Sequence, residues 1–159
     1  MRTRHKDPDR PGPIAPWHQI RPFLWMGGHG WTDSAGKARA AVVTNEFDLV
    51  ISLFTRDGHG PDRGVEHVIL EIPDAPLVAE QIDGARRLGA IAADAVRQRR
   101  NTLVRCRSGM NRSGLVVGQA VIDLGLTAPK AITLIRRRRS RGALNNEVFV
   151  AYLNRGLDT

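Results

Sequence analysis

Residues 102–114 read TLVRCRSGMNRSG, and this stretch decides the fold. Residues 102–105 are expected to form a short strand that ends at the chain's one cysteine, Cys106. Five residues then separate Cys106 from Arg112, where a helix over about residues 112–124 is expected to begin. A short loop between a strand end and a helix N-terminus can direct several backbone N–H groups at one point, and the helix dipole adds positive potential there. The stretch therefore predicts an anion-binding loop.

Cys106 is a candidate nucleophile within this loop. Positive potential favours the thiolate over the thiol, and the thiolate can attack phosphorus in line. Arg112 can donate two hydrogen bonds to a phosphate, while Gly109 lets the loop curl where a side chain would obstruct it. The alternative is that Cys106 is a small buried hydrophobic residue at a strand end.

Outward from this loop, apolar runs of strand length alternate with stretches of helical spacing. Strands are expected over residues 23–26, 49–54, 65–72 and 102–105, and helices over residues 37–46, 77–100, 112–124, 129–142 and 146–155. This alternation predicts an α/β fold with a mainly parallel central sheet flanked by helices. Residues 1–16 are basic and rich in proline and predict a flexible tail, which leaves residues 17–159 as one domain.

Composition narrows the class of protein further. The net charge is +8, which indicates an anionic partner, and the single cysteine excludes a disulfide framework. No apolar stretch is long enough for a membrane span, and the charged N-terminus is not a secretory signal. We therefore expect a cytoplasmic protein. Nucleic acid is a less favoured partner, because the eight aromatic residues do not alternate with basic ones.

Residues 106–113 resemble the signature loop of the cysteine-dependent protein tyrosine phosphatases, in their compact, bacterial-type dual-specificity branch. Weaker resemblances over residues 20–28, 48–54, 72–74 and 131–149 extend the match to about residues 17–157. The order of elements is similar to that branch and not to the low-molecular-weight enzymes, because a candidate acid, Asp74, lies 32 residues before the cysteine. The resemblance implies a dual-specificity phosphatase-like fold.

The resemblance also implies roles for individual residues. Cys106 would be the nucleophile, Arg112 would bind the phosphate, Asp74 would act as general acid and then base, and Ser113 would hydrogen-bond the leaving thiolate. The expected substrate-binding residues are Arg107, Ser108, Gly109, Met110 and Asn111. Asp57 and Asp62 are alternatives for the acid, while Asp74 could be a turn residue and Ser113 a helix-start residue. Neither cofactor nor metal is expected, since His29 and His59 have no second ligand at metal spacing.

Arg105 departs from the family pattern, and the run Arg136–Arg139 has two interpretations. Arg105 occupies the position where the family usually has a histidine that orients the loop and holds the thiolate. Its guanidinium could lower the thiol pKa through space, or it could point away, because neighbouring strand residues face opposite ways. The run Arg136–Arg139 could be a solvated helix end or an anion-binding patch.

The function that the sequence predicts is hydrolysis of phosphate monoesters through a phosphocysteine. Phosphotyrosine in proteins is the favoured substrate, followed by phosphoserine and phosphothreonine. One alternative is an RNA 5′-phosphatase, because Asn111 before Arg112 also occurs in related RNA 5′-triphosphatases. A phosphoinositide phosphatase and a catalytically silent phosphate-binding module are the others. The sequence does not decide the oligomeric state.

Overall fold

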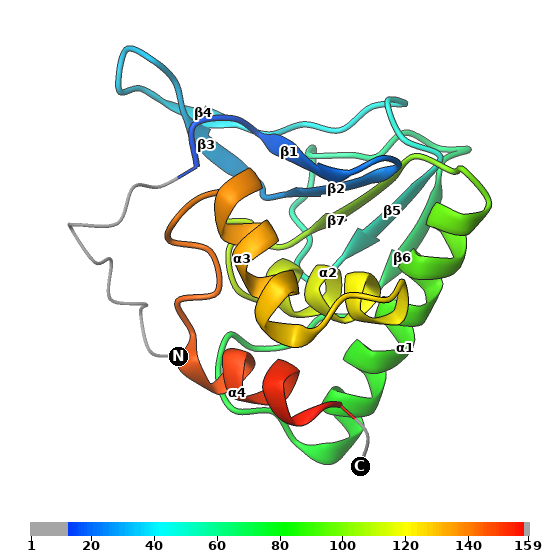
Figure 1. Ribbon diagram of the computed structural model, residues 1–159. Coiled ribbons are helices and arrows are strands. Elements are labelled where there is room, and N and C mark those ends of the chain that lie inside the picture. Colours follow the sequence, from blue (N-terminus) through cyan, green and yellow to red (C-terminus); the bar gives the residue numbers. More distant parts are fainter. Residues whose placement is uncertain (1–12, 158–159) are drawn as a thin grey trace.

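The computed structural model describes residues 13–157 and contains a five-stranded sheet with helices packed on it (Figure 1). The strands lie in the order β1 (Trp17–Arg21), β2 (Leu24–Gly27), β7 (Thr102–Arg105), β5 (Leu49–Ser52) and β6 (Glu66–Ile69). Only β1 runs antiparallel to its neighbour, and the other pairs are parallel. The prediction of an α/β fold with a mainly parallel sheet is therefore confirmed.

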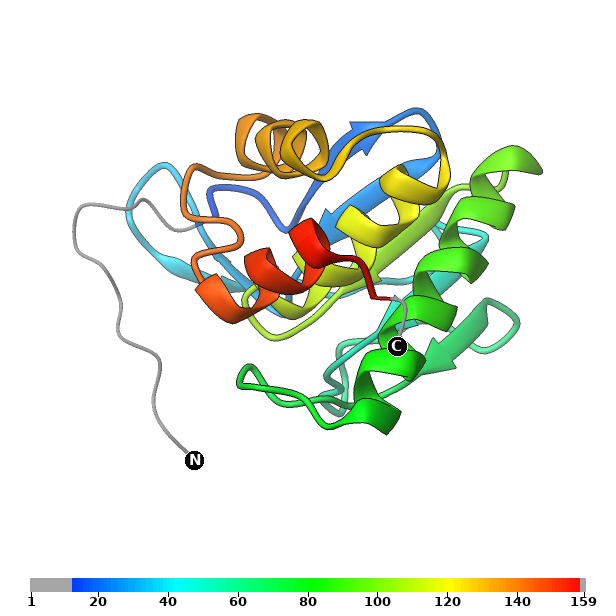
Figure 2. The ribbon, with the colours of Figure 1, turned by 60° about the horizontal axis from the view of Figure 1, so that its bottom comes forward.

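One helix organises the packing on the sheet. The helices are α1 (Ala79–Arg97), α2 (Arg112–Asp123), α3 (Ala128–Arg138) and α4 (Glu147–Arg155). Helix α2 is central, because it contacts α1, α3 and α4 as well as β2 and β7 (Figure 2). Its first ten residues are all buried, so the start of α2 is held firmly where β7 ends.

The two faces of the sheet carry separate cores. The larger core lies on the helical face and includes Met26, Val104 and Leu115. A smaller core on the other face joins Val43 and Phe47 to strand residues, and the Phe47 ring packs edge-on against two tryptophans, Trp17 and Trp25. Residues of the connection between β4 and β5 thus cover the face that has no helices.

The expected helix over residues 37–46 is wrong. This region contains strand β4 (Ala38–Ala40), which pairs with β3 (Gly30–Thr32), followed by an extended segment. Buried and exposed positions alternate there, since Val43 is buried while Val42 is 45% exposed. The Asp33 carboxylate accepts two backbone N–H bonds in the turn that joins β3 to β4, and this closes a hairpin where the helix was expected.

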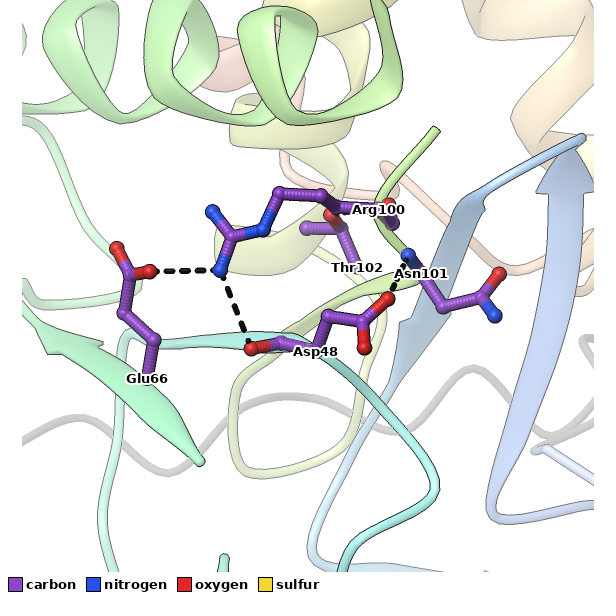
Figure 3. A network of polar contacts seen from close by, with 5 residues as sticks. All are labelled: Asp48, Glu66, Arg100, Asn101 and Thr102. Atoms are coloured by element: carbon purple, nitrogen blue, oxygen red, sulfur yellow. Dashed lines mark hydrogen bonds and ion pairs between the residues drawn. The ribbon is translucent and has the colours of Figure 1, made fainter. Parts of the chain in front are cut away.

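Polar contacts align the strands at the edge opposite the signature loop (Figure 3). Arg100 donates to the Glu66 carboxylate at 2.6 Å and to the Asp48 carbonyl oxygen at 3.4 Å. The Asp48 carboxylate in turn accepts the Asn101 backbone N–H at 2.8 Å. These contacts join the starts of β5, β6 and β7, so they fix the relative register of the strands whose far ends carry the candidate site.

Residues 1–12 of the predicted tail lie outside the described residues. Residues 13–16 lie against the domain, where the carbonyl oxygen of Pro16 accepts the Gly28 N–H and that of Ala15 accepts a bond from Arg139. No helix within residues 13–157 has the length and apolar character needed to cross a membrane.

Candidate active site

Cys106 directly follows β7 and lies at the carboxyl ends of the parallel strands. Its side chain is only 1% exposed, and its sulfur lies 3.3 Å from the hydroxyl oxygen of Ser113 in the first turn of α2. The backbone N–H of Cys106 donates to the carbonyl oxygen of Gly27, at the end of β2. Two strands and one helix therefore fix the position of the thiol.

The surroundings of Cys106 favour its thiolate. Burial raises the pKa of the thiol, but the Arg112 guanidinium, the Ser113 hydroxyl and the backbone N–H groups of Ser113 and Met110 act against burial and outweigh it. The net effect holds the pKa of Cys106 below its ordinary value. A thiol with a lowered pKa at a strand end has the chemistry of a nucleophile.

The carbonyl oxygens of the signature loop, residues 106–111, are held from outside the loop. His29 holds the first two: its Nδ1 lies 2.9 Å from the Cys106 carbonyl oxygen, and its backbone N–H donates to that of Arg107 at 2.8 Å. The Arg139 guanidinium donates to the carbonyl oxygens of Ser108 (Nη2, 3.4 Å) and Gly109 (Nε, 3.1 Å). The backbone N–H of Leu144 donates to the carbonyl oxygen of Met110 at 3.0 Å. The only cis peptide bond among residues 13–157 lies elsewhere, at Gly60–Pro61. In a trans peptide the C=O and the following N–H point in opposite directions. The N–H groups of residues 107–111 therefore face the inside of the loop and form a cradle for an anion.

Glycine is required at two places around this cradle. Gly109 has φ +71°, and a Cβ there would lie 2.5 Å from the Arg139 guanidinium and from the backbone of Gly27. A Cβ on Gly28 would lie 2.7 Å from the backbone of Ser108. The end of β2 thus packs directly on the loop, and the expectation that Gly109 lets the loop curl is confirmed.

Arg112 is the first residue of α2 and is almost fully buried. One Nη group donates to the carbonyl oxygen of Ile72 at 3.1 Å, and the guanidinium lies over the Phe54 ring, 5.6 Å from its centroid. Within residues 13–157 no other hydrogen bond engages this fork, so its remaining N–H groups can serve a bound anion. The anchoring bond and the ring together fix the plane of the guanidinium.

Asp74 is joined to the signature loop by a cluster of asparagines. Its carboxylate accepts from the amide of Asn111 at 3.1 Å and from the amide of Asn146 at 2.8 Å. The Asn111 side chain also accepts the backbone N–H of Asn146 and donates to the side chain of Asn145. Asn146 is the N-cap residue of α4, and its side-chain oxygen accepts backbone N–H groups of the first turn of that helix. The segment with Asp74, the loop and the start of α4 therefore form one hydrogen-bonded unit.

The alternative acids do not join this unit. Asp57 and Asp62 lie in the connection between β5 and β6, where the backbone N–H of Asp62 donates to Thr44. In the described part of the chain, neither carboxylate is hydrogen-bonded to the signature loop. No three His, Cys, Asp or Glu side chains gather as a set of metal ligands within residues 13–157.

Arg105 points away from the sulfur. Its side chain is fully buried on the face without helices, where the guanidinium donates to the backbone carbonyl oxygens of His59 and Ala41 at 3.1 and 3.3 Å. Burial lowers the pKa of Arg105 to about 10, although the charge of Cys106 acts in the opposite direction. The guanidinium of Arg105 therefore points away from the sulfur, while its charge and that of Cys106 still act on each other through space.

The structure divides the expected substrate-binding residues into two groups. The side chain of Arg107 is exposed and that of Ser108 is partly exposed, so both can reach a ligand outside the loop. Met110 lies in the larger core, and the amide of Asn111 is engaged with Asp74. Only the backbone N–H groups of Met110 and Asn111, like that of Gly109, can contact a bound phosphate.

Arg139 and His29 hold the loop, and neither role was predicted from the sequence. Arg139 belongs to the run Arg136–Arg139, but its side chain is buried and reaches the signature loop. Arg136 caps the carbonyls of residues 143 and 144, whereas Arg137 and Arg138 are exposed. The solvated interpretation of this run therefore holds only for its two middle residues.

Several solved structures share this fold. Human DUSP28 superposes with a TM-score of 0.69 and 22% identity, covering 91% of this chain and 95% of that one. A mouse dual-specificity phosphatase, complexed with zinc tungstate, gives 0.62 and 22%, covering 96% and 91%. PTPMT1 in complex with PI(5)P gives 0.60 and 13%, covering 89% and 96%. These likenesses show that the chain has the fold of dual-specificity phosphatases.

No protein-family model matches the sequence. No curated protein matches it either. The likeness is therefore one of fold, and the activity has to be argued from the site.

Proposed function

We propose that the chain is a phosphatase that hydrolyses phosphate monoesters of proteins through a phosphocysteine, with phosphotyrosine as the favoured substrate. One observation carries this proposal: a thiol of lowered pKa lies at the centre of a ring of inward N–H groups, beside an anchored arginine. Such a ring binds the equatorial oxygens of a phosphoryl group and stabilises their charge in the transition state. We infer that a phosphate bound there presents its ester bond in line with the Cys106 sulfur.

In the first half-reaction the Cys106 thiolate attacks phosphorus and forms the S–P bond, while the ester P–O bond breaks. The leaving phenoxide or alkoxide takes a proton from Asp74, which the asparagine cluster joins to the loop. Arg112 binds two of the equatorial oxygens with its fork. The products of this step are the free tyrosine, serine or threonine and the phosphocysteine.

In the second half-reaction water attacks phosphorus and gives a proton to the Asp74 carboxylate. The S–P bond breaks, and its electron pair returns to the Cys106 sulfur as a thiolate. The hydroxyl of Ser113, at 3.3 Å, donates to that sulfur and lowers the cost of expelling it. Inorganic phosphate leaves, and the enzyme returns to its starting state.

The shape of the site supports phosphotyrosine as the favoured substrate. The Cys106 side chain is only 1% exposed, and an enclosed nucleophile suits the long side chain of phosphotyrosine better than the short one of phosphoserine. The Phe54 ring lies beside the site, under both Arg112 and the exposed Arg56, and offers an aromatic wall to a phenyl ester. The RNA 5′-phosphatase alternative rests on Asn111 alone, and the Asn111 amide donates to Asp74. We place the protein in the cytoplasm, whose reducing conditions keep the thiol free.

The proposed function predicts which substrate of a panel is hydrolysed best. We expect phosphate release from a phosphotyrosine peptide with a higher kcat/KM than from a phosphoserine peptide, a phosphoinositide or RNA 5′-triphosphate. Release should persist in EDTA, because a phosphocysteine mechanism uses no metal. It should stop with vanadate. Hydrolysis that is abolished by EDTA would contradict the mechanism. Phosphopeptide binding without any hydrolysis would instead identify a silent binding module.

Replacement of Asp74 by alanine is expected to slow hydrolysis according to the leaving group. An alkyl phosphate needs protonation of its oxygen, so we expect a loss of about 10²- to 10⁴-fold, the usual contribution of a general acid. A nitrophenyl phosphate expels a stable phenoxide and should lose much less. The measurement is kcat over a series of phosphate esters with different leaving-group pKa values.

Asp62→Ala is the matched control for this variant, because Asp62 lies in the neighbouring connection without a bond to the loop. It should respond to the leaving group as the wild type does. The role of Asp74 would be disproved if the Asp62 variant, and not the Asp74 variant, showed the steeper dependence.

A further inference from the structure

His29 follows β2 and lies against the outside of the signature loop. Its Nδ1 is 2.9 Å from the Cys106 carbonyl oxygen, and its backbone N–H donates to the Arg107 carbonyl oxygen at 2.8 Å. The imidazole is 3% exposed and packs edge-on against the Phe54 ring at 5.1 Å between centroids. One residue thus contacts the first two carbonyls of the loop and is itself held rigidly.

The contact with Cys106 sets the direction of the first cradle donor. A carbonyl oxygen only accepts hydrogen bonds, so Nδ1 of His29 carries the hydrogen. Because the peptide between Cys106 and Arg107 is trans, holding its oxygen outward turns the Arg107 N–H inward. The same peptide plane adjoins the Cα that carries the thiol. A change in its tilt would therefore move both the donor and the sulfur.

Among the described residues, no other side chain is hydrogen-bonded to the Cys106 carbonyl oxygen. Arg105, the nearest candidate in the sequence, is bonded to the backbone oxygens of His59 and Ala41 and not to that of Cys106. Arg139 holds the loop at Ser108 and Gly109 and is not bonded to Cys106. Within residues 13–157 the Cys106 carbonyl oxygen has a side-chain donor only in His29.

We propose that His29 is a positioning residue for catalysis, which orients the Cys106–Arg107 peptide and thereby the nucleophile and the first N–H of the phosphate cradle. This inference rests on the proposed phosphatase function. His29 lies 77 positions before the nucleophile in the sequence. It would orient the loop, which Arg105 does not do.

The charge state of His29 suits a fixed donor. Burial is the main cause that lowers the pKa of His29, to about 4, and the charges of Arg105, His59 and Arg56 act in the same direction, whereas the bond to Cys106 opposes them. The imidazole is therefore neutral at the pH values at which phosphatases are assayed, with its hydrogen on Nδ1. The cations that act electrostatically with Cys106 are Arg112, Arg105 and Arg139.

Two substitutions of similar polarity separate a positioning role from a packing role. The amide nitrogen of asparagine takes nearly the place of imidazole Nδ1, whereas that of glutamine lies one bond further out, near Nε2. We expect His29→Asn to retain kcat/KM within about fivefold and His29→Gln to lose about ten- to a hundredfold, the rate equivalent of a missing buried hydrogen bond. Vanadate inhibition should weaken in the glutamine variant alone.

Alkylation of Cys106 by iodoacetamide gives a readout that does not need turnover. Its midpoint pH should rise in His29→Gln and stay near the wild-type value in His29→Asn, with unchanged circular dichroism in both. His59→Asn is the control, because the His59 ring lies 5.4 Å from that of His29 and its Nδ1 has no partner. We expect it to remain within about threefold of wild type in kcat/KM.

Equal effects of the asparagine and glutamine variants, whether large or absent, would overturn the inference. A protein that hydrolyses no phosphate ester would refute the proposed function, while the alkylation profiles would still decide whether His29 controls the nucleophile. The two failures are therefore distinguishable.

Discussion

The Cys106→Ser variant is expected to lose at least about 10⁴-fold in turnover on any phosphate ester, as nucleophile replacements do. Burial raises the pKa of the Cys106 thiol, but Arg112, Ser113 and the neighbouring N–H groups outweigh burial and hold this pKa below its ordinary value. An alcohol starts from a far higher pKa, so the same field leaves it protonated. The measurement is phosphate release from a phosphotyrosine peptide and from an aryl phosphate.

Binding should survive this substitution. The cradle is held by carbonyl contacts that involve the backbone of the loop, and the backbone N–H of residue 106 keeps its bond to Gly27. Fluorescence polarisation with a labelled phosphopeptide should therefore report an affinity near the wild-type value, with the unphosphorylated peptide as the control ligand. Residual turnover above about one hundredth of the wild-type rate would be incompatible with Cys106 as the nucleophile.

The thiolate itself can be titrated in the wild-type protein, because Cys106 is the only cysteine. A lowered pKa means that the thiolate, the reactive form, persists to lower pH. An ordinary thiol is modified with a midpoint at about pH 8.5, and iodoacetamide should modify Cys106 with a midpoint below that value. Bound phosphate should protect Cys106 from modification. A midpoint at or above the ordinary value would show that burial outweighs the positive groups.

The strand, loop and helix around Cys106 were predictable because local chemistry determines them. Residues 102–105 form a buried strand that ends at the loop, and a glycine stands at position 109, where φ is positive. The family resemblance pointed to Asp74, and its place beside the loop agrees with topology, because the carboxyl ends of parallel strands meet at one edge of the sheet. The local sequence pattern was sufficient to predict this segment, because residues adjacent in the chain determine its geometry.

The residues that hold the loop were not predictable in the same way. His29 and Asn146 reach the site from distant segments, and a buried polar group chooses its partner only when tertiary packing is complete. Arg139 did carry a signal: it is the C-cap residue of α3 and follows the buried residues Ile132 and Ile135 at helical spacing. An arginine on an apolar stripe indicates a buried partner, in contrast to its exposed neighbours in the run.

Replacement of Arg112 by alanine is expected to lower kcat/KM by about 10³-fold or more, as the loss of an arginine at a transferring phosphoryl group does. Two effects combine, because the guanidinium both offers its fork to the phosphate and favours the Cys106 thiolate. The alkylation midpoint of Cys106 should therefore rise along with the loss of turnover. The measurements are steady-state kinetics on an aryl phosphate and the pH profile of alkylation.

Arg112→Lys separates the two effects, because lysine keeps the charge and lacks the planar fork. An ammonium group near the sulfur should keep the alkylation midpoint close to wild type. It cannot hold both the Ile72 carbonyl and two phosphate oxygens in one plane, so turnover should fall nearly as far as in Arg112→Ala. Arg137→Lys, on the exposed side of α3, is the matched control and should behave as wild type. If Arg112→Lys kept turnover within about tenfold, charge alone would suffice and the bidentate role of Arg112 would have to be abandoned.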